Sequence, residues 1–224
     1  MNKKTDKKIR ISDAAAVKYL KNDRFTIASL ADELDMEASE IYDFFPNRRS
    51  ILQFYYEATI IKYRQIITQI DDYNSFSMAE KLSTLALTLL DLFQENREFV
   101  KRTYSSYVVC NSGSTQFEKS LKHEIASIYK SDQKQSRAAS LLNIEPIFEL
   151  ILYHFHGLIR FWLRDHSEGY QKTMELVDKW TAFVQEVNYS SILDRGFELA
   201  KFATYQTPLK NVFSSSHNNP TENE

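Results

Sequence analysis

Histidine and cysteine are the side chains that most readily build a catalytic or metal site, and their spacing in this chain supports neither. His154 and His156 are two residues apart, so on a helix they point about 200° apart and cannot share one ion. We expect both to pack in a core or an interface. The single cysteine, Cys110, is expected to be a small buried side chain. No glycine-rich phosphate loop, GxSxG or HExxH sequence occurs. The sequence predicts no catalytic residue, metal or cofactor, and therefore no enzyme.

The stretch from Thr26 to Leu52 offers another chemistry, that of contacting a nucleic-acid duplex. Carboxylates can accept hydrogen bonds from cytosine amino groups, and hydroxyl and guanidinium groups hold phosphates. On a helical wheel, one polar side carries Glu37, Ser39, Glu40 and Asp43. Arg48 stands at the start of a further helix, where backbone N–H groups can help it bind an anion.

Two short helices would have to position these side chains. The first repeats apolar residues at the spacing of one buried stripe, and Thr26 precedes it as an N-cap. Its stripe is Ile27, Leu30, Ala31 and Leu34, and that of the second helix, over residues 37–45, is Ala38, Ile41, Tyr42 and Phe45. Neither helix is long enough to form alone. They must brace each other and a third helix, which predicts a helix-turn-helix whose second helix enters a major groove.

This stretch resembles the N-terminal domain of TetR-type transcriptional regulators, whose pattern reads roughly T-x-x-x-I-A-x-x-x-G-V-S-x-x-x-[LI]-Y-x-[HY]-F-x-[SN]-K-x-x-L. The matching positions are Thr26, Leu30–Ala31, Met36, Ile41–Tyr42, Phe44–Phe45, Asn47, Arg48 and Ile51–Leu52. The resemblance implies an all-α fold, in which a three-helix head is joined by a long helix to an all-helical ligand-binding and dimerisation domain. It also implies a homodimer on a palindromic double-stranded DNA operator. The residues expected to contact DNA are Thr26, Glu37, Ser39, Glu40, Tyr42, Asp43, Arg48 and Arg49.

Composition agrees with a helical protein. The 224 residues include only four Gly and four Pro, and 43% are hydrophobic, which favours helices over strands and turns. The sequence has no apolar run of about 18 residues and no signal peptide. We therefore expect no membrane span. One cysteine cannot form an internal disulfide, which fits a reducing compartment, so we expect a cytoplasmic location.

The charge distribution leaves a second function open. Residues 1–8 are rich in lysine, and we expect them to form a disordered basic arm. Between Thr26 and Asn47 there are six carboxylates and no lysine or arginine. Because duplex binding draws much of its affinity from phosphate neutralisation, the alternative is a TetR-like fold that binds a lipid or another small hydrophobe and has weak or no DNA binding.

Other helical patterns occur at about residues 9–22, 47–70, 78–95, 97–110, 115–129, 146–166, 171–187 and 192–205, and Thr115 is expected to cap the helix at 115–129. The pattern at 146–165 is apolar nearly all round, and the one at 171–187 follows it directly. Two adjacent long helices with excess apolar surface suggest an isologous four-helix dimer interface.

Aromatic residues are concentrated outside the helix-turn-helix, among 13 Tyr and 15 Phe. A mostly apolar ligand site could be lined by Tyr104, Tyr107, Tyr153, His154, Phe161 and Trp162. An aromatic core without a cavity is an equally open alternative. The sequence thus predicts a DNA-binding head at residues 1–50, a helical domain at 51–205 and a disordered tail at 206–224. Such a protein would be a repressor that responds to an apolar or amphipathic small molecule by shifting the long helix between the domains.

Overall fold

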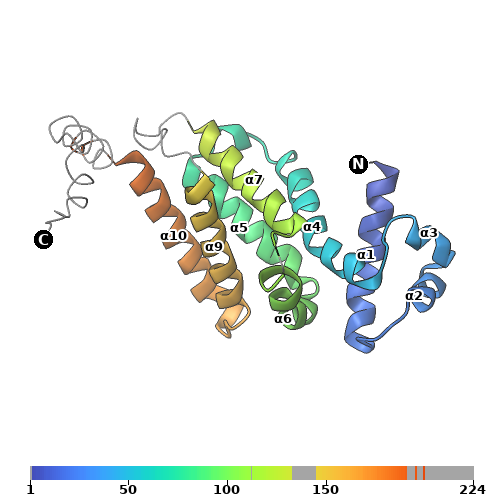
Figure 1. The fold of residues 1–224 in the computed structure, drawn as a ribbon. Coiled ribbons are helices and arrows are strands. Elements are labelled where there is room, and N and C mark those ends of the chain that lie inside the picture. The colour runs from blue at the N-terminus through green and yellow to red at the C-terminus, as the bar shows by residue number, and fades with distance from the viewer. Residues whose placement is uncertain (1, 112, 133–144, 191–194, 196–198, 200–224) are drawn as a thin grey trace, which may run out of the picture.

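The computed structural model describes the chain except for residues 1, 112, 133–144, 191–194, 196–198 and 200–224. Within the described part all regular structure is helical, which confirms the predicted all-α fold (Figure 1). The α-helices are α1 (Lys3–Lys21), α2 (Ile27–Leu34), α3 (Ala38–Tyr42), α4 (Arg48–Ile67), α5 (Met78–Gln94), α6 (Arg97–Tyr104), α7 (Gln116–Ser131), α9 (Glu145–Trp162) and α10 (Gln171–Tyr189). Short 3-10 helices cover Tyr73–Ser75 and Glu168–Tyr170, and a π-helical turn covers Ser105–Val109.

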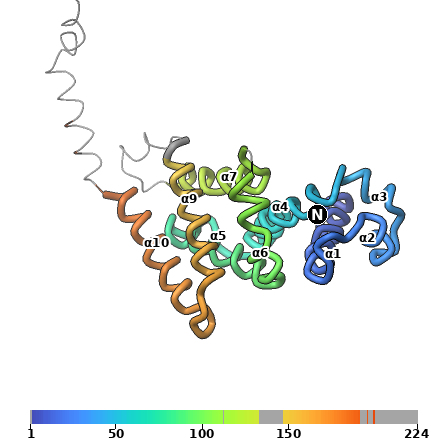
Figure 2. Tube along the Cα trace, turned by 60° about the horizontal axis from the view of Figure 1, so that its bottom comes forward, coloured from blue at the N-terminus to red at the C-terminus, as the bar shows by residue number. Residues whose placement is uncertain are grey.

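The helices form a small head and a larger bundle. Figure 1 shows α1, α2 and α3 at one end of the molecule, with α4 leading from them into the bundle. Helix α4 packs against α1 in the head and against α7 and α5 in the bundle, while α10 packs mainly against α5. Figure 2 shows α9 and α10 at the end of the bundle farthest from the head. No helix in the described part is long and apolar enough to cross a membrane.

Helix α2 has the predicted start and the predicted buried side. The Thr26 hydroxyl accepts a hydrogen bond from the backbone N–H of Ser29, and the four predicted stripe residues are buried. Helix α3 is shorter than predicted and ends at Tyr42. Helical backbone is disfavoured at the residue before a proline, so Pro46 prevents α3 from continuing through Phe45. Tyr42 was predicted to lie on the buried stripe, which is wrong, because 56% of it is exposed.

The first helix begins before the predicted position. Residues 1–8 were predicted to be a disordered arm, but α1 starts at Lys3 and is capped by the Asn2 side chain, which accepts a hydrogen bond from the Lys4 N–H. Lys7 and Lys8 have partners on other helices, and Lys7 pairs with Glu40 of α3. The Lys8 ammonium lies 4.1 Å from the centroid of the Phe54 ring, a cation–π contact. Because these lysines contact groups on neighbouring helices, the segment continues α1 and does not form a solvated arm.

Aromatic rings fill the centre of the bundle. The Tyr55 ring meets the Phe99 ring edge to face at 4.9 Å, and Tyr56 lies within 5.8 Å of Phe93. The Tyr56 hydroxyl shares a 2.6 Å hydrogen bond with Thr103, which satisfies a buried polar group. This region follows the predicted alternative of a packed aromatic core.

The later helices agree with the sequence-based pattern in position and differ at their ends. Thr115 caps α7 as predicted, in a capping box with Glu118. Cys110 was predicted to be buried but is exposed, at the end of the π-helical turn. The predicted helix at 192–205 and tail at 206–224 lie outside the described residues, apart from Arg195 and Leu199.

Candidate functional site

Helix α3 presents a polar side to solvent. Glu37, Ser39, Tyr42 and Asp43 are all exposed. Glu37 is the N-cap of the helix, and its backbone N–H donates to the Glu40 carboxylate at 3.3 Å. Ser39 and Tyr42 are therefore the exposed hydrogen-bonding groups of α3 that carry no charge.

Two carboxylates of the acidic stretch are neutralised by lysines of α1. Lys7 forms an ion pair with Glu40, and the Lys18 ammonium lies 2.7 Å from the Glu33 carboxylate. The hydrogen bond from Lys7 holds the pKa of Glu40 below its usual value, and the hydrogen bond from Lys18 does the same for Glu33. Glu40 was predicted to face bases, and here its carboxylate is already engaged. Its partner comes from the segment that was predicted to be an arm.

The two arginines that open α4 bind within the protein. Arg48 donates to the backbone oxygen of Phe25 at 3.2 Å, and its guanidinium lies 5.6 Å from the Phe25 ring centroid. Arg49 donates to the Ser106 backbone oxygen at 3.3 Å and lies 5.0 Å from the Tyr107 ring centroid. Arg49 thus joins the head to the π-helical turn of the bundle. Both were predicted to contact DNA, and their carbonyl and aromatic partners, 23 and 57 residues away, could not be read from the local sequence.

The turn between α2 and α3 contains Asp35 in the left-handed region, at φ 53° and ψ 52°. The TetR-type pattern has glycine here. A side chain in this conformation costs about 1–2 kcal/mol, although aspartate tolerates it better than most residues. The Asp35 carboxylate is exposed beside α3, so this position combines backbone strain with a negative charge.

The structure does not bring the six predicted ligand residues around one cavity. Tyr104 and Trp162 are buried, Tyr107 is half-buried beneath Arg49, and His154, Tyr153 and Phe161 are exposed. Tyr153 is 70% exposed on the outer side of α9. His154 lines an apolar cavity of about 250 Å³ between α7, α9 and α10, together with Ile147, Leu150, Trp180 and Phe183.

A buried polar chain crosses the bundle instead. The Tyr104 hydroxyl lies 2.7 Å from Nδ1 of His156, whose Nε2 lies 3.2 Å from the Glu118 carboxylate. Glu118 also accepts from the Thr115 N–H at 2.6 Å. Burial works to raise the pKa of Glu118, but the hydrogen bonds from His156 and Thr115 outweigh it and the pKa lies below its usual value. Sequence reasoning placed His156 in packing and missed the chain, because its members lie on α6, α7 and α9. The described residues hold no group of three or more His, Cys, Asp or Glu side chains that could bind a metal.

The outer side of α9 and α10 exposes large apolar side chains. Phe183 is 66% exposed and Leu150 is 51% exposed. The other exposed apolar residues of these helices are Tyr153, Phe161, Met174, Leu176 and Val187. An apolar surface of this kind commonly marks an interaction site, and it lies on the helices predicted to form a dimer interface.

Comparison with known proteins gives a match to a protein family and a likeness to solved structures. Residues 81–203 match the family model described as tetracyclin repressor-like, C-terminal domain. Among solved structures, the TetR transcriptional regulator from Nitrosomonas europaea superposes with a TM-score of 0.57 at 13% sequence identity, over 81% of this chain and 98% of that chain. At this identity the likeness shows the fold. None of the curated proteins matches the sequence.

Proposed function

The chain belongs to the tetracycline-repressor-like (TetR) family of transcriptional regulators, and from this premise we propose that it is a homodimeric repressor that binds a palindromic DNA operator through residues 1–50. The family match covers residues 81–203, whereas the helix-turn-helix pattern covers Thr26–Leu52. Two parts of the chain that do not overlap therefore support the same assignment.

The observation that carries DNA binding is that lysines of α1 neutralise two of the six carboxylates in the acidic stretch. Lys7 and Lys18 pair with Glu40 and Glu33, so α3 can approach a phosphate backbone with less repulsion than its sequence implies. Ser39 and Tyr42 then offer exposed hydroxyl groups, Ser39 toward bases and Tyr42 toward phosphate. Thr26, at the N-terminus of α2, is a second phosphate contact.

The two-fold symmetry of such an operator requires two heads. The exposed apolar side of α9 and α10, centred on Leu150 and Phe183, is the surface that a second copy would cover. An isologous contact there forms a four-helix interface at the end of the bundle away from the heads.

Operator selection from fragmented genomic DNA tests the proposal. Purified protein should enrich a palindromic sequence, and a Ser39→Ala, Tyr42→Phe double variant should enrich it less while remaining a folded dimer. The affinity should fall as salt rises, with a slope that counts the phosphate contacts. Failure to enrich any palindrome at low salt overturns DNA binding.

A second function is supported by the carboxylates that remain. Among the described residues Asp32, Asp35, Glu37 and Asp43 have no ion-pair partner and are exposed, and the 250 Å³ cavity between α7, α9 and α10 is almost entirely apolar. These features suit a protein of the same family that binds a lipid or another small hydrophobe with weak or no DNA binding. In a dimeric regulator, an apolar or amphipathic effector in this cavity would be enclosed by the second copy, because Leu150 and Phe183 belong both to the cavity lining and to the proposed dimer surface. Native mass spectrometry of protein purified from cells should reveal a bound lipid, and an empty protein that takes up none argues against both ligand roles.

A further inference from the structure

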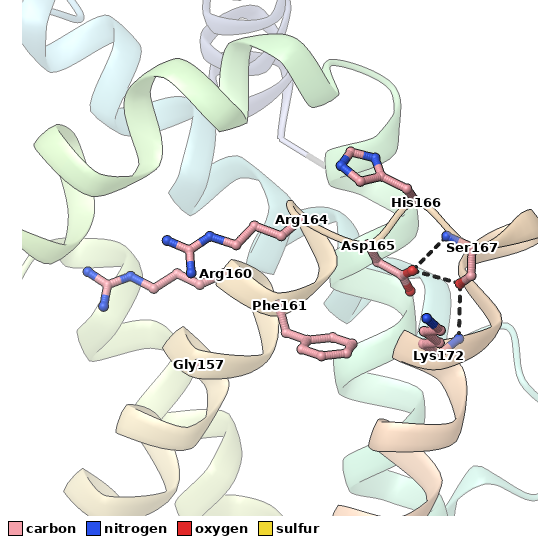
Figure 3. A pocket seen from close by; sticks show the side chains of 8 residues that line it. All are labelled: Gly157, Arg160, Phe161, Arg164, Asp165, His166, Ser167 and Lys172. Atoms are coloured by element: carbon pink, nitrogen blue, oxygen red, sulfur yellow. Dashed lines mark hydrogen bonds between the residues drawn. The ribbon is translucent and has the colours of Figure 1, made fainter.

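A hollow of about 650 Å³ lies where α9 ends and α10 begins (Figure 3). It is separate from the apolar cavity beside His154. Its lining residues are Gly157, Arg160, Phe161, Arg164, Asp165, His166, Ser167 and Lys172. Three of these carry a permanent positive charge, and one carries a carboxylate.

The carboxylate is already committed to the protein. Asp165 accepts hydrogen bonds from the Ser167 hydroxyl at 2.6 Å and from the Thr173 hydroxyl and N–H at 2.6 and 2.9 Å. These bonds hold its pKa well below the usual value, so it stays ionised and stabilises the start of α10. With both oxygens engaged, Asp165 is not placed to pair with the cations around it.

The two arginines have no ion-pair or hydrogen-bond partner in the described part of the chain. Arg160 and Arg164 are exposed, stand one helical turn apart, and extend in the same direction (Figure 3). Neither forms an ion pair or hydrogen bond with a described side chain. The backbone oxygens at the end of α9 are taken by another arginine, since Arg97 donates to Trp162 and Leu163 at 3.2 and 3.0 Å. Two adjacent guanidinium groups repel each other until an anion lies between them.

The rest of the hollow offers apolar surface and space. Phe161 also lines the hollow and is 41% exposed, and its ring extends toward the start of α10, away from the two guanidinium groups (Figure 3). A Cβ placed on Gly157 would meet no atom within 4 Å, so the helix surface beside the arginines is open. The combination of paired cations, an exposed ring and open space suits a ligand with a charged head and an apolar body.

We propose that this hollow is a binding site for an organic anion, with a carboxylate or phosphate head held by Arg160 and Arg164 and an apolar body against Phe161 and Gly157. The site concerns ligand binding alone and does not depend on operator binding. Its failure is therefore separable from failure of the DNA-binding proposal. If the protein is a regulator, this class of molecule is its candidate effector.

Isothermal titration of the full chain with matched ten-carbon probes tests the site. Decanoate and decyl phosphate should both bind and decanol should bind far more weakly, because only the first two supply an anionic head. The comparison of decanoate with decyl phosphate identifies which head is preferred. Inorganic phosphate separates binding of the head alone from binding that needs the apolar body.

Two variants locate the binding. Arg160→Gln with Arg164→Gln should weaken the anionic probes about 30-fold or more, whereas Lys101→Gln with Arg102→Gln removes the same charge from α6 and should leave affinity unchanged. Gly157→Leu keeps both arginines and fills the open space, so it should also reduce binding of the long-chain probes. Thermal unfolding and molar mass are measured for each variant.

Three results would overturn the proposal. The first is decanol binding as tightly as decanoate, and the second is the α6 control losing as much affinity as the Arg160→Gln, Arg164→Gln variant. The third is a wild-type dimer that binds neither anion and dissociates when Arg160 and Arg164 are replaced, which would assign the arginines to contact with a second copy.

Discussion

Lys7, Lys18 and Arg48 in the head each bind a carboxylate or a carbonyl of the same chain, whereas Arg160 and Arg164 at the end of α9 are exposed and form no ion pair or hydrogen bond with a described side chain. The head was expected to hold the cations that bind an external anion. The difference teaches that a basic residue in a sequence is not necessarily a basic residue available for binding. Whether a cation is free to bind an external anion depends on the partners that the tertiary structure supplies. In the described part of this molecule the arginines at the end of the bundle are free of such partners, whereas those at the start of α4 are not.

The largest loss of stability is expected on the buried side of α9, where polar side chains are hydrogen-bonded to each other just as the cations of the head are paired. His156→Leu leaves the Tyr104 hydroxyl and the Glu118 carboxylate without their partner, so the free energy of unfolding should fall by about 3 kcal/mol. Urea unfolding measures this. His154→Leu, on the exposed side of the same helix, is the control, and equal losses for both variants would refute the buried chain.

The same chain predicts how stability depends on pH. Because the pKa of folded Glu118 lies below its ordinary value of 4.5, its contribution is fully present above about pH 4.5 and is lost as the pH falls through the folded value. Unfolding free energies of the wild type and of Glu118→Gln should therefore converge on acidification. Parallel curves over this range would contradict the prediction.

The next effect concerns the apolar side of α9 and α10. Phe183→Glu places a charge at the centre of the proposed dimer interface and should weaken dimerisation by about 2 kcal/mol or more, which is about 30-fold in the dissociation constant. Sedimentation equilibrium measures this. Ala182→Glu adds the same charge at the neighbouring exposed position, and similar dissociation of both variants would mean that the interface is not centred on Phe183.

A gain in stability is expected in the head. Asp35→Gly keeps the left-handed backbone conformation of this turn but removes its steric strain, so it should stabilise the protein by about 1 kcal/mol. It also removes an exposed carboxylate beside α3, so operator affinity should rise. Asp35→Asn removes the charge alone, and if it stabilises as much as glycine, strain at this turn is not the cause.

The smallest effect is expected at Tyr42. Tyr42→Phe removes one exposed hydroxyl, and loss of one hydrogen bond to phosphate should weaken operator binding about 3- to 10-fold. Fluorescence anisotropy with the selected operator measures this. Thermal stability should not change, because the hydroxyl makes no contact within the described protein, and unchanged operator affinity would place Tyr42 outside the DNA contact.

What the sequence allowed one to predict depends on how far away each partner lies. The caps by Thr26 and Thr115 and the buried stripe of α2 follow from residues three or four positions apart, and all were predicted. Arg49 bonds to Ser106, and His156 bonds to Glu118 and Tyr104. These contacts require the packing of helices that are distant in sequence. The same holds for the aromatic residues proposed as one ligand site, since helical periodicity says which side of a helix is apolar but not which cavity that side lines.

The π-helical turn after α6 has a consequence for comparing relatives. Its closing hydrogen bond runs from the Cys110 N–H to the Ser105 oxygen at 2.8 Å, so the turn contains one residue more than an α-helical turn would. Tyr104, just before this turn, is buried in the core, while Tyr107, within the turn, lies beneath Arg49. A relative in which this segment is an ordinary α-helix should align with a one-residue gap between Ser105 and Cys110. Deleting one residue there would rotate everything from Tyr107 to the next turn by about 100°, and would separate Arg49 from its ring.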